Sequence, residues 1–269
     1  MPSKNILFFG DICSETGRQA VTDNLKKIKE TESVTFVIGE GENTAAGFGI
    51  TPKIVNELLD AGVDCITLGD HFLDRSEIVP TLESNPRLLR PANFHNDVPG
   101  RGAGIYALGD TKIGVISLLG RVFLKPIGCP FERAMLELEN IRKETPIIFV
   151  DFHAEATAEK KALGWYLDGK VTGIIGTHTH VQTADEQILP NGTAYITDIG
   201  MCGAMNSVLG MRIDLSVKKL LYSIPLRLQP AKDNIHINGA IITVDTETGK
   251  ALSIKRLDLK ITEPAPEAQ

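Results

Sequence analysis

The sequence predicts an α/β protein in which two mixed β-sheets pack face to face between outer helices, a four-layer α/β/β/α sandwich. Two patterns support this prediction. In the first part of the chain, short apolar runs alternate with helical periodicity, which favours parallel βαβ units. In the last part, turn signals separate alternating strands, which favours antiparallel pairing. The 269 residues show no repeat or linker and can bury an ample core, so we treat 1–269 as a single domain.

Five short apolar runs are predicted to be buried strands, because they are rich in β-branched or aromatic residues and bounded by glycine or proline. They comprise residues 6–9, 34–38, 65–68, 147–150 and 173–176. Each run leads directly into carboxylate, amide or imidazole side chains. In an open α/β sheet, ligands bind beyond the carboxyl ends of the strands. We therefore expect five distant segments to deliver these polar groups to one place.

The remaining elements follow from helical periodicity and turn residues. Helices are expected at 17–30, 51–61, 131–142 and 154–167. The second of these has a favourable entry, since Thr51 can cap a helix that begins with Pro52. Hairpins are expected at Gly109-Asp110, Asn191-Gly192 and Thr248-Gly249. Residues 263–269, rich in proline and alanine, are expected to fray.

Charge and composition narrow the function classes. The formal net charge of -6 provides no overall attraction to nucleic acid or to an anionic membrane, so we expect no stable nucleic acid complex. The N-terminus leads into a strand without a signal-peptide pattern, and no apolar stretch approaches a membrane span. These features predict a cytoplasmic protein without membrane association. The four cysteines have no CxxC spacing and are predicted to be reduced thiols.

His178-Thr179-His180 is the most informative short motif. In an extended segment alternate side chains share a face, so both imidazoles can point to one side while Thr179 points away. On its own the motif is more often a polar loop. The polar residues at the other strand ends favour metal ligands.

Glu42-Asn43, Asp70-His71 and Asp11 supply the other groups. Taken singly, each is as typical of an N-cap or a turn. Together, the clustered carboxylates would repel one another, and a carboxylate that bridges two divalent ions explains their proximity. Oxygen and imidazole donors suit iron, manganese or zinc. Two such ions about 3.5 to 4 Å apart favour phosphoester hydrolysis.

The chain also resembles a known family, the YmdB-type metallophosphoesterases, a bacterial calcineurin-like branch described as cyclic nucleotide phosphodiesterases. The resemblance runs nearly from end to end. Its motifs are Phe9-Gly10-Asp11, Gly41-Glu42-Asn43, Leu68-Gly69-Asp70-His71, Arg90-Pro91-Ala92-Asn93, Asp151-Phe152-His153-Ala154-Glu155-Ala156-Thr157, Ala162-Leu163-Gly164-Trp165-Tyr166 and the ten residues from Gly176 to Asp185. The resemblance implies the calcineurin-like metallophosphoesterase fold.

The resemblance further implies a ligand set and a reaction. One metal would be held by Asp11, Glu42, Asn43 and His180, and a second by Glu42, Asp70, His153 and His178, with Glu42 bridging. His71 would be the catalytic residue, a general acid that protonates the leaving oxygen. The implied reaction is hydrolysis of a small phosphodiester, such as a 2′,3′- or 3′,5′-cyclic nucleotide, by a metal-bridging hydroxide. We expect two iron ions, with manganese or zinc as alternatives.

Two departures from the family pattern affect the chemistry. The family usually has Gly-Asn-His where this chain has Gly69-Asp70-His71. Two divalent ions and the carboxylates of Asp11, Glu42 and Asp70 leave a charge of +1, where an asparagine would leave +2. We expect tighter metal binding and weaker attraction of the phosphate anion. The second departure is Cys13, which stands where many phosphoesterases of the wider superfamily have a histidine ligand; a thiolate ligand and a small loop residue are both open, and the second is favoured.

Other functions are left open by the sequence. A regulatory protein could keep the metal site and bind a nucleotide with little turnover, and Asp70 is the residue that makes this credible. A phosphodiesterase directed at RNA is another alternative, although the acidic balance gives it no electrostatic help. A homo-oligomer is compatible with the sequence.

Overall fold

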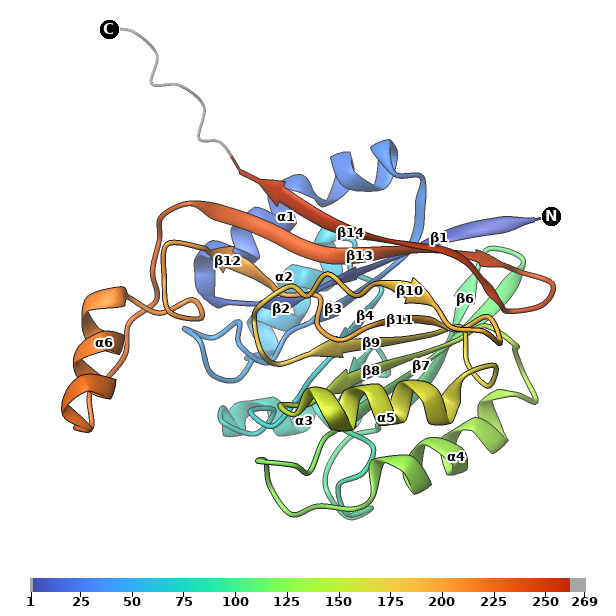
Figure 1. The fold of residues 1–269 in the computed structure, drawn as a ribbon, viewed down its shortest axis with the longest axis horizontal. Coiled ribbons are helices and arrows are strands. Elements are labelled where there is room, and N and C mark those ends of the chain that lie inside the picture. Colours follow the sequence, from blue (N-terminus) through green and yellow to red (C-terminus); the bar gives the residue numbers. More distant parts are fainter. Residues whose placement is uncertain (1, 262–269) are drawn as a thin grey trace, which may run out of the picture.

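The computed structural model describes residues 2–261, which form two mixed β-sheets packed face to face with helices on the outer sides (Figure 1). The predicted tail at 263–269 lies outside the described residues. The first sheet has the order β2-β12-β13-β1-β3-β4-β5, with β14 paired to β13. Its strands are β1 (Ser3–Phe9), β2 (Asp11–Ile12), β3 (Val34–Glu40), β4 (Cys65–Thr67), β5 (Leu88–Leu89), β12 (Met201–Ala204), β13 (Ile235–Asp245) and β14 (Ala251–Lys260).

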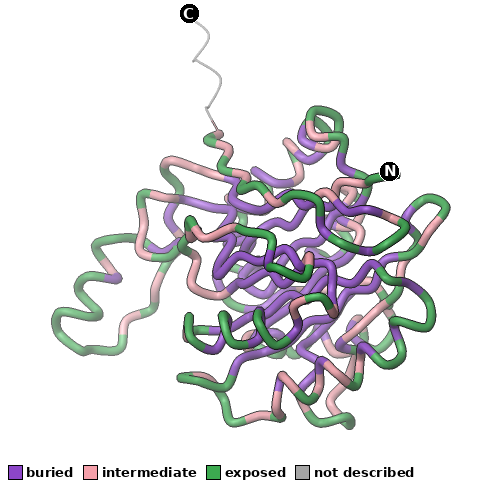
Figure 2. Tube along the Cα trace, turned by 45° about the vertical axis from the view of Figure 1, so that its right-hand side comes forward, coloured by how far each residue is buried: buried purple, intermediate pink, exposed green. Residues whose placement is uncertain are grey.

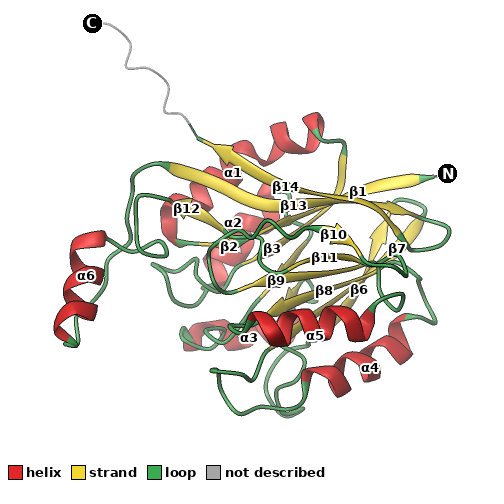
Figure 3. Cartoon of the chain, in the orientation of Figure 1, coloured by secondary structure: helices red, strands yellow, loops and turns green. Residues whose placement is uncertain are grey.

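The second sheet has the order β10-β11-β9-β8-β7-β6. Its strands are β6 (Ala103–Leu108), β7 (Thr111–Leu119), β8 (Ile148–His153), β9 (Gly173–Thr177), β10 (Gln187–Ile188) and β11 (Ala194–Ile196). The helices are α1 (Ser14–Thr31), α2 (Pro52–Ala61), α3 (Val79–Ser84), α4 (Pro130–Ile141), α5 (Thr157–Leu167) and α6 (Ile213–Tyr222), with a short 3₁₀ turn at Ser76–Ile78 (Figure 3).

Side-chain alternation along the strands produces the layers. In β1, Leu7 and Phe9 pack into the cluster that includes α1 and α2, whereas Ile6 and Phe8 pack into the cluster between the two sheets. On the second sheet, Phe149 faces the same central cluster, while its neighbours in β8 pack against α4 and α5. Burial is accordingly greatest through the middle of the molecule (Figure 2). The predicted four-layer α/β/β/α sandwich is confirmed.

The carboxyl ends of the central strands meet at one edge of each sheet. Strands β1, β3 and β4 are parallel neighbours in the first sheet, and β8 and β9 are parallel neighbours in the second. The two edges are tied together. Ser117 Oγ of β7 donates to the backbone oxygen of Leu68 at 2.9 Å, and the Thr67 hydroxyl donates to Asp151 of β8. Side chains that follow these five strands are therefore placed around a common space.

Most predicted elements are present, and the hairpin signals are correct. The Asn191-Gly192 turn joins β10 to β11, and Gly249 lies in the turn between β13 and β14 with φ +71°. Antiparallel pairing of β13 with β1, β12 and β14 dominates the last part of the chain, as expected. Helices α3 and α6 are not among the predicted helices. In residues 2–261, no helix has both the length and the apolar character needed to cross a membrane.

Replacement of a side chain between the sheets should reveal how far the sandwich depends on this contact. Phe149 is fully buried, and its ring centroid lies 5.4 Å from that of Phe8 across the interface. We expect Phe149→Ala to lower the free energy of unfolding by about 3 to 5 kcal/mol, because it leaves a cavity in a packed core. Urea denaturation measures this change. Phe123→Ala is the control, since Phe123 is 86% exposed, and equal losses in the two variants would contradict the interpretation.

Candidate metal centre

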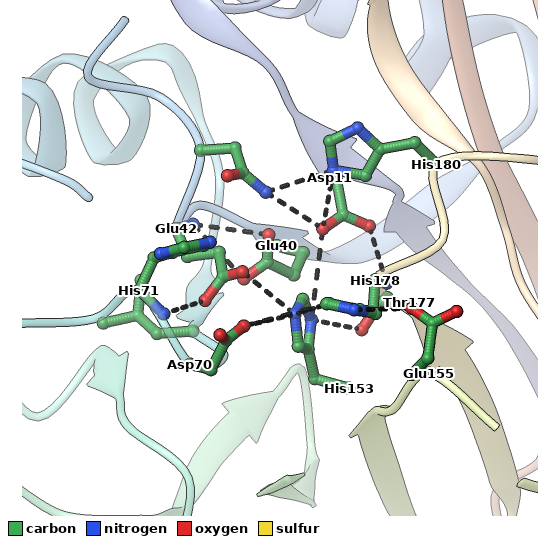
Figure 4. A network of polar contacts seen from close by, with 12 residues as sticks. Asp11, Glu40, Glu42, Asp70, His71, His153, Glu155, Thr177, His178 and His180 are labelled. Carbon is green, nitrogen blue, oxygen red and sulfur yellow. Dashed lines mark hydrogen bonds and ion pairs between the residues drawn. The ribbon is translucent and has the colours of Figure 1, made fainter. Parts of the chain in front are cut away.

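The structure brings all seven predicted metal ligands together where the carboxyl ends of the two sheets meet (Figure 4). We call this set the strand-end cluster. The first sheet contributes its acidic and amide members, and the second contributes the histidines. The cluster consists of Asp11, Glu42, Asn43, Asp70, His153, His178 and His180.

Four members form a compact group whose potential ligand atoms all lie within 4.8 Å of one another: Glu42, Asp70, His153 and His178. Glu42 Oε1 lies 2.9 Å from His153 Nε2, and His178 Nδ1 lies 2.9 Å from the same nitrogen. This is the set that the family resemblance implies for one of the two metals.

The other members surround Asp11. Asn43 Nδ2 lies 3.3 Å from Asp11 Oδ1 and 3.2 Å from His180 Nε2, and His180 Nε2 lies 3.5 Å from Asp11 Oδ1. Rotation of the Asn43 amide by about 180° would place its oxygen, instead of its nitrogen, toward Asp11 and His180. The amide nitrogen and oxygen are nearly identical in shape, so this change needs no other movement. Carboxylate, amide and imidazole are thus available for a second ion.

Two oxygen atoms of the cluster show that the donor set fits a cation. Glu42 Oε1 and Asp70 Oδ1 are buried, and neither has a hydrogen-bond partner among the described residues. A buried carboxylate oxygen without a donor is costly, because it has lost its hydration and gained nothing in return. A divalent ion between these oxygens and the adjacent imidazole nitrogens would remove this cost. Oxygen and imidazole donors also suit iron, manganese and zinc.

A chain of hydrogen bonds orients His153 as a ligand would need. The Thr177 hydroxyl donates to Asp151 Oδ1 at 2.8 Å, so its oxygen accepts from His153 Nδ1 at 3.0 Å. With a proton on Nδ1, the ring directs Nε2 toward Glu42 and Asp70, so Nε2 is the atom that a metal ion would take in place of a proton. Burial raises the pKa of Asp151 to about 6, which still leaves the carboxylate mainly ionised at neutral pH.

The backbone of the His178-Thr179-His180 motif differs from our prediction. We expected an extended segment, but His178 has φ +103° and His180 has φ +62°, so alternation along a strand does not explain their shared direction. Positive φ at a non-glycine residue is strained and persists only where the surroundings impose it. Here each imidazole reaches the cluster from a turn that follows β9 (Figure 4).

Both rings of this motif are fixed by a second contact. His178 Nε2 lies 3.0 Å from Glu155 Oε2, and His180 Nδ1 donates to the backbone oxygen of Leu209 at 3.2 Å. In each ring the nitrogen directed away from the cluster holds a proton for these acceptors. The nitrogen directed into the cluster, Nδ1 of His178 and Nε2 of His180, is the one whose lone pair can bind a metal ion once it has lost any proton.

A buried ion pair supports the strained turn. Lys160 Nζ donates to Asp198 Oδ2 and to the backbone oxygen of Thr177, both at 2.7 Å. The same Asp198 oxygen accepts from the backbone N–H of Thr179 at 3.0 Å. Lys160 and Asp198 are almost fully buried, so their attraction is little screened by solvent. The pair therefore holds the backbone on both sides of His178.

Glu40 lies beside the cluster, and it forms a second group with Asp11, Glu42 and His153 whose potential ligand atoms all lie within 4.8 Å of one another. The backbone N–H of Glu42 approaches its two carboxyl oxygens at 3.2 and 3.3 Å. Burial, together with the charges of Asp11 and Glu42, raises the pKa of Glu40 well above its ordinary value. A protonated Glu40 adds no further negative charge to the site.

The carboxylate of Asp11 and the imidazole of His180 each favour the charged form of the other. Burial favours the neutral form of Asp11, but the nearby His180 and His153 outweigh it and lower the pKa of Asp11. Burial likewise opposes charge on His180, but Asp11 raises the pKa of this imidazole. Asp11 is therefore ionised, and a metal ion would compete with protons for the imidazole nitrogens.

His71 lies at the rim of the cluster. Its backbone N–H donates to Glu42 Oε2 at 2.8 Å, and its side chain, 30% exposed, lines a cavity next to Glu42, Asn43, His178 and His180. Nδ1 of the ring is 2.8 Å from Asp74 Oδ2, and the ring packs edge-on against Phe48 with centroids 5.2 Å apart. Asp74 and Phe48 therefore fix how His71 is presented.

Cys13 lies outside the ligand groups. Burial, with a contribution from the charge of Asp11, raises the pKa of its thiol to about 12, so the sulfur stays protonated. Its Sγ points toward Gly210, where an added Cβ would approach it to 2.4 Å. These contacts are typical of a small packed residue.

Several supporting residues were not identified from the sequence: Glu40, Asp74, Asp151, Glu155, Lys160 and Asp198. Asp151 offered the clearest signal, since it is an acidic residue inside an apolar strand and must be paired there. Asp74 stands three residues after His71, but that spacing alone is common. Lys160 and Asp198 are far apart in sequence and give no local signal.

Known proteins resemble the chain over nearly its whole length. The family model for YmdB-like proteins matches residues 7–257. A 2′,3′-cyclic-nucleotide 2′-phosphodiesterase from Bacillus subtilis (strain 168) is 44% identical over 252 residues, which cover 94% of this chain and 96% of the relative.

Two solved structures have the same fold. A hypothetical protein from Thermus thermophilus superimposes with a TM-score of 0.89 at 34% identity, covering 95% of this chain and 99% of the other. A protein from Mycoplasma pneumoniae described as a novel phosphatase gives a TM-score of 0.91 at 32% identity, covering 97% and 94%. The family model spans nearly the whole chain, and the strand-end cluster lies within the matched residues. This chain therefore belongs to the YmdB-like family.

Proposed function

We propose that the chain is a dinuclear metal-dependent phosphodiesterase that hydrolyses small phosphodiesters, with 2′,3′- or 3′,5′-cyclic nucleotides as its substrates. The observation that carries the proposal is the pair of buried carboxylate oxygens without hydrogen-bond partners among the described residues, Glu42 Oε1 and Asp70 Oδ1, beside the His153 imidazole. The activity named for the Bacillus subtilis relative supports the choice of substrate. Cytoplasmic location and a homo-oligomer stay predictions.

The residues divide between two ions. Glu42, Asp70, His153 and His178 would hold one, and Asp11, Glu42, Asn43 and His180 would hold the other, with Glu42 shared. Bound divalent ions would lower the pKa of water and neutralise charge that develops on a phosphoryl group. Iron is our first choice, followed by manganese or zinc. Asp151, Thr177 and Asp198 would keep the ligands oriented.

His71 would be the general acid. It lines the cavity beside the cluster. Asp74 Oδ2 accepts a hydrogen bond from its Nδ1 at 2.8 Å, which leaves Nε2 free to exchange a proton with a substrate oxygen. Proton transfer from Nε2 to the departing oxygen would leave a neutral imidazole hydrogen-bonded to Asp74.

One observation keeps a regulatory role as the second candidate. The carboxylate of Asp70 makes the site more negative than an asparagine would, which disfavours an incoming phosphate anion. A metal site that binds a nucleotide with little turnover would have this property. Turnover of a cyclic nucleotide by protein loaded with manganese or iron distinguishes the enzyme from the regulator.

The contribution of Asp70 can be measured directly. We expect Asp70→Asn to weaken binding of at least one metal ion by roughly 10- to 100-fold, the scale of substitutions around metal sites. Isothermal titration with Mn²⁺ measures the affinity and stoichiometry. Asp110→Asn is the matched control, because Asp110 is 94% exposed and far from the cluster along the chain. Equal affinity in Asp70→Asn and the wild type would refute the charge argument.

The general acid can be tested separately from metal binding. His71→Ala should lower kcat by about 10²- to 10⁴-fold, the usual contribution of general acid catalysis. Asp74→Asn should lower it less, because the imidazole remains in place. Elemental analysis should find the same metal content as in the wild type. His95→Ala, at an exposed histidine, should have full activity; a His71→Ala variant with normal kcat would exclude His71 as the acid.

A further inference from the structure

A cavity of about 360 Å³ opens beside the strand-end cluster and has two unlike walls. One wall is polar and consists of cluster residues with His71 and Glu155. The opposite wall comes from the segment that carries α6 and is largely apolar. The volume of the cavity lies in the range of small-molecule sites, which are mostly apolar with a few well-placed polar groups. We define the α6 wall as Met211, Ser216, Leu220 and Leu228.

The α6 wall is continuous with the loop that carries Phe48. Gly47 has φ +96°, and a Cβ at this position would lie 2.0 Å from Met211 Cε, so the methionine side chain packs directly on the backbone of the loop. Phe48, which is 42% exposed, also lines the cavity and contacts His71. A molecule whose reacting end lies at the cluster would therefore meet an apolar surface at its other end.

One polar atom in this wall has no partner. Ser216 is 4% exposed and is the buried residue of α6, yet its Oγ has no hydrogen-bond partner among residues 2–261. A buried hydroxyl left unpaired costs free energy that a ligand group could recover. The hydroxyl can both donate and accept. An occupant that fits this wall is largely apolar and carries a polar atom for the Ser216 hydroxyl.

Helix α6 projects from the sandwich (Figure 3). Its side chains differ in whether they line the cavity. Leu220 and Leu221 are adjacent and almost equally exposed, at 72% and 69%. Only Leu220 of the two lines the cavity. Lys219 lines it as well and is the one lysine or arginine among the lining residues of this cavity, whose acidic lining residues are Glu42 and Glu155.

We propose, on the basis of the proposed function, that the α6 wall binds the nucleobase of the substrate and so determines the preference for nucleotides over other diesters. Met211 and Leu220 contact the faces of the base, and the Ser216 hydroxyl bonds to its polar edge. The phosphodiester lies at the strand-end cluster. Chemistry and recognition then reside on different parts of the chain.

The test compares two cyclic diesters, 2′,3′-cyclic AMP and glycerol 1,2-cyclic phosphate, which has no base. For each variant we measure the ratio of kcat/KM for the nucleotide to kcat/KM for the glycerol compound. Ser216→Ala and Leu220→Ala should lower this ratio by about 3- to 10-fold, the scale of one lost hydrogen bond or apolar contact. Leu221→Ala is the matched control and should leave the ratio unchanged.

A thermal melt separates recognition from folding. Loss of an unpaired hydroxyl does not destabilise a fold, so Ser216→Ala should keep the Tm of the wild type while its ratio falls. Equal effects of Leu220→Ala and Leu221→Ala, or a wild type without preference for the nucleotide, would overturn the inference and leave the proposed function intact.

If the protein loaded with manganese or iron hydrolyses neither diester, the proposed function is refuted. In that case, the binding of adenosine 3′-monophosphate tests the inference. Weaker binding by Ser216→Ala and Leu220→Ala than by Leu221→Ala supports the α6 wall. Equal binding by the three variants, or no binding by the wild type, overturns it.

Discussion

The alignment of two sheet edges is the constraint on which the rest of the structure depends. Hydrogen bonds from Ser117 to Leu68 and from Thr67 to Asp151 cross the central interface near the carboxyl ends of the strands. They keep the end of β4 in register with the ends of β7 and β8. Without this register, the carboxylates of the first sheet and the imidazoles of the second would not share one space. The fold therefore creates the site before any ligand contributes.

That concentration of acceptors has an electrostatic cost, and the chain limits it in three ways. Burial keeps Glu40 neutral, Lys160 neutralises Asp198, and Asp151 receives two hydroxyl donors. None of these acids faces the cluster as a free charge. The remaining negative charge lies on Asp11, Glu42 and Asp70, next to the histidines, and a bound cation would neutralise it. A buried site that neutralises its supporting acids in this way can select a metal by its ligands.

How far the sequence predicts this structure depends on whether a signal is local. The strand runs, the Asn191-Gly192 hairpin and the polar residues after each strand are local patterns, and the structure contains all of them. The support for the histidines is not local. Thr177 and Asp151, or Lys160 and Asp198, meet only after the sheets have packed. The positive φ of His178 also depends on that packing, so an argument from strand alternation could not find it.

The cluster and helix α6 differ in how firmly the core holds them, and this difference affects which residues can change. The cluster rests on strands of both sheets, and its supporting contacts are buried, so a change at Asp198 or Asp151 would disturb several ligands at once. Helix α6 contributes little to the core, since Ser216 is its buried residue. Its side chains can therefore change without altering the arrangement of the carboxylates and imidazoles. A rigid cluster beside a wall of few core contacts separates the geometry that chemistry requires from the surface that selects the substrate.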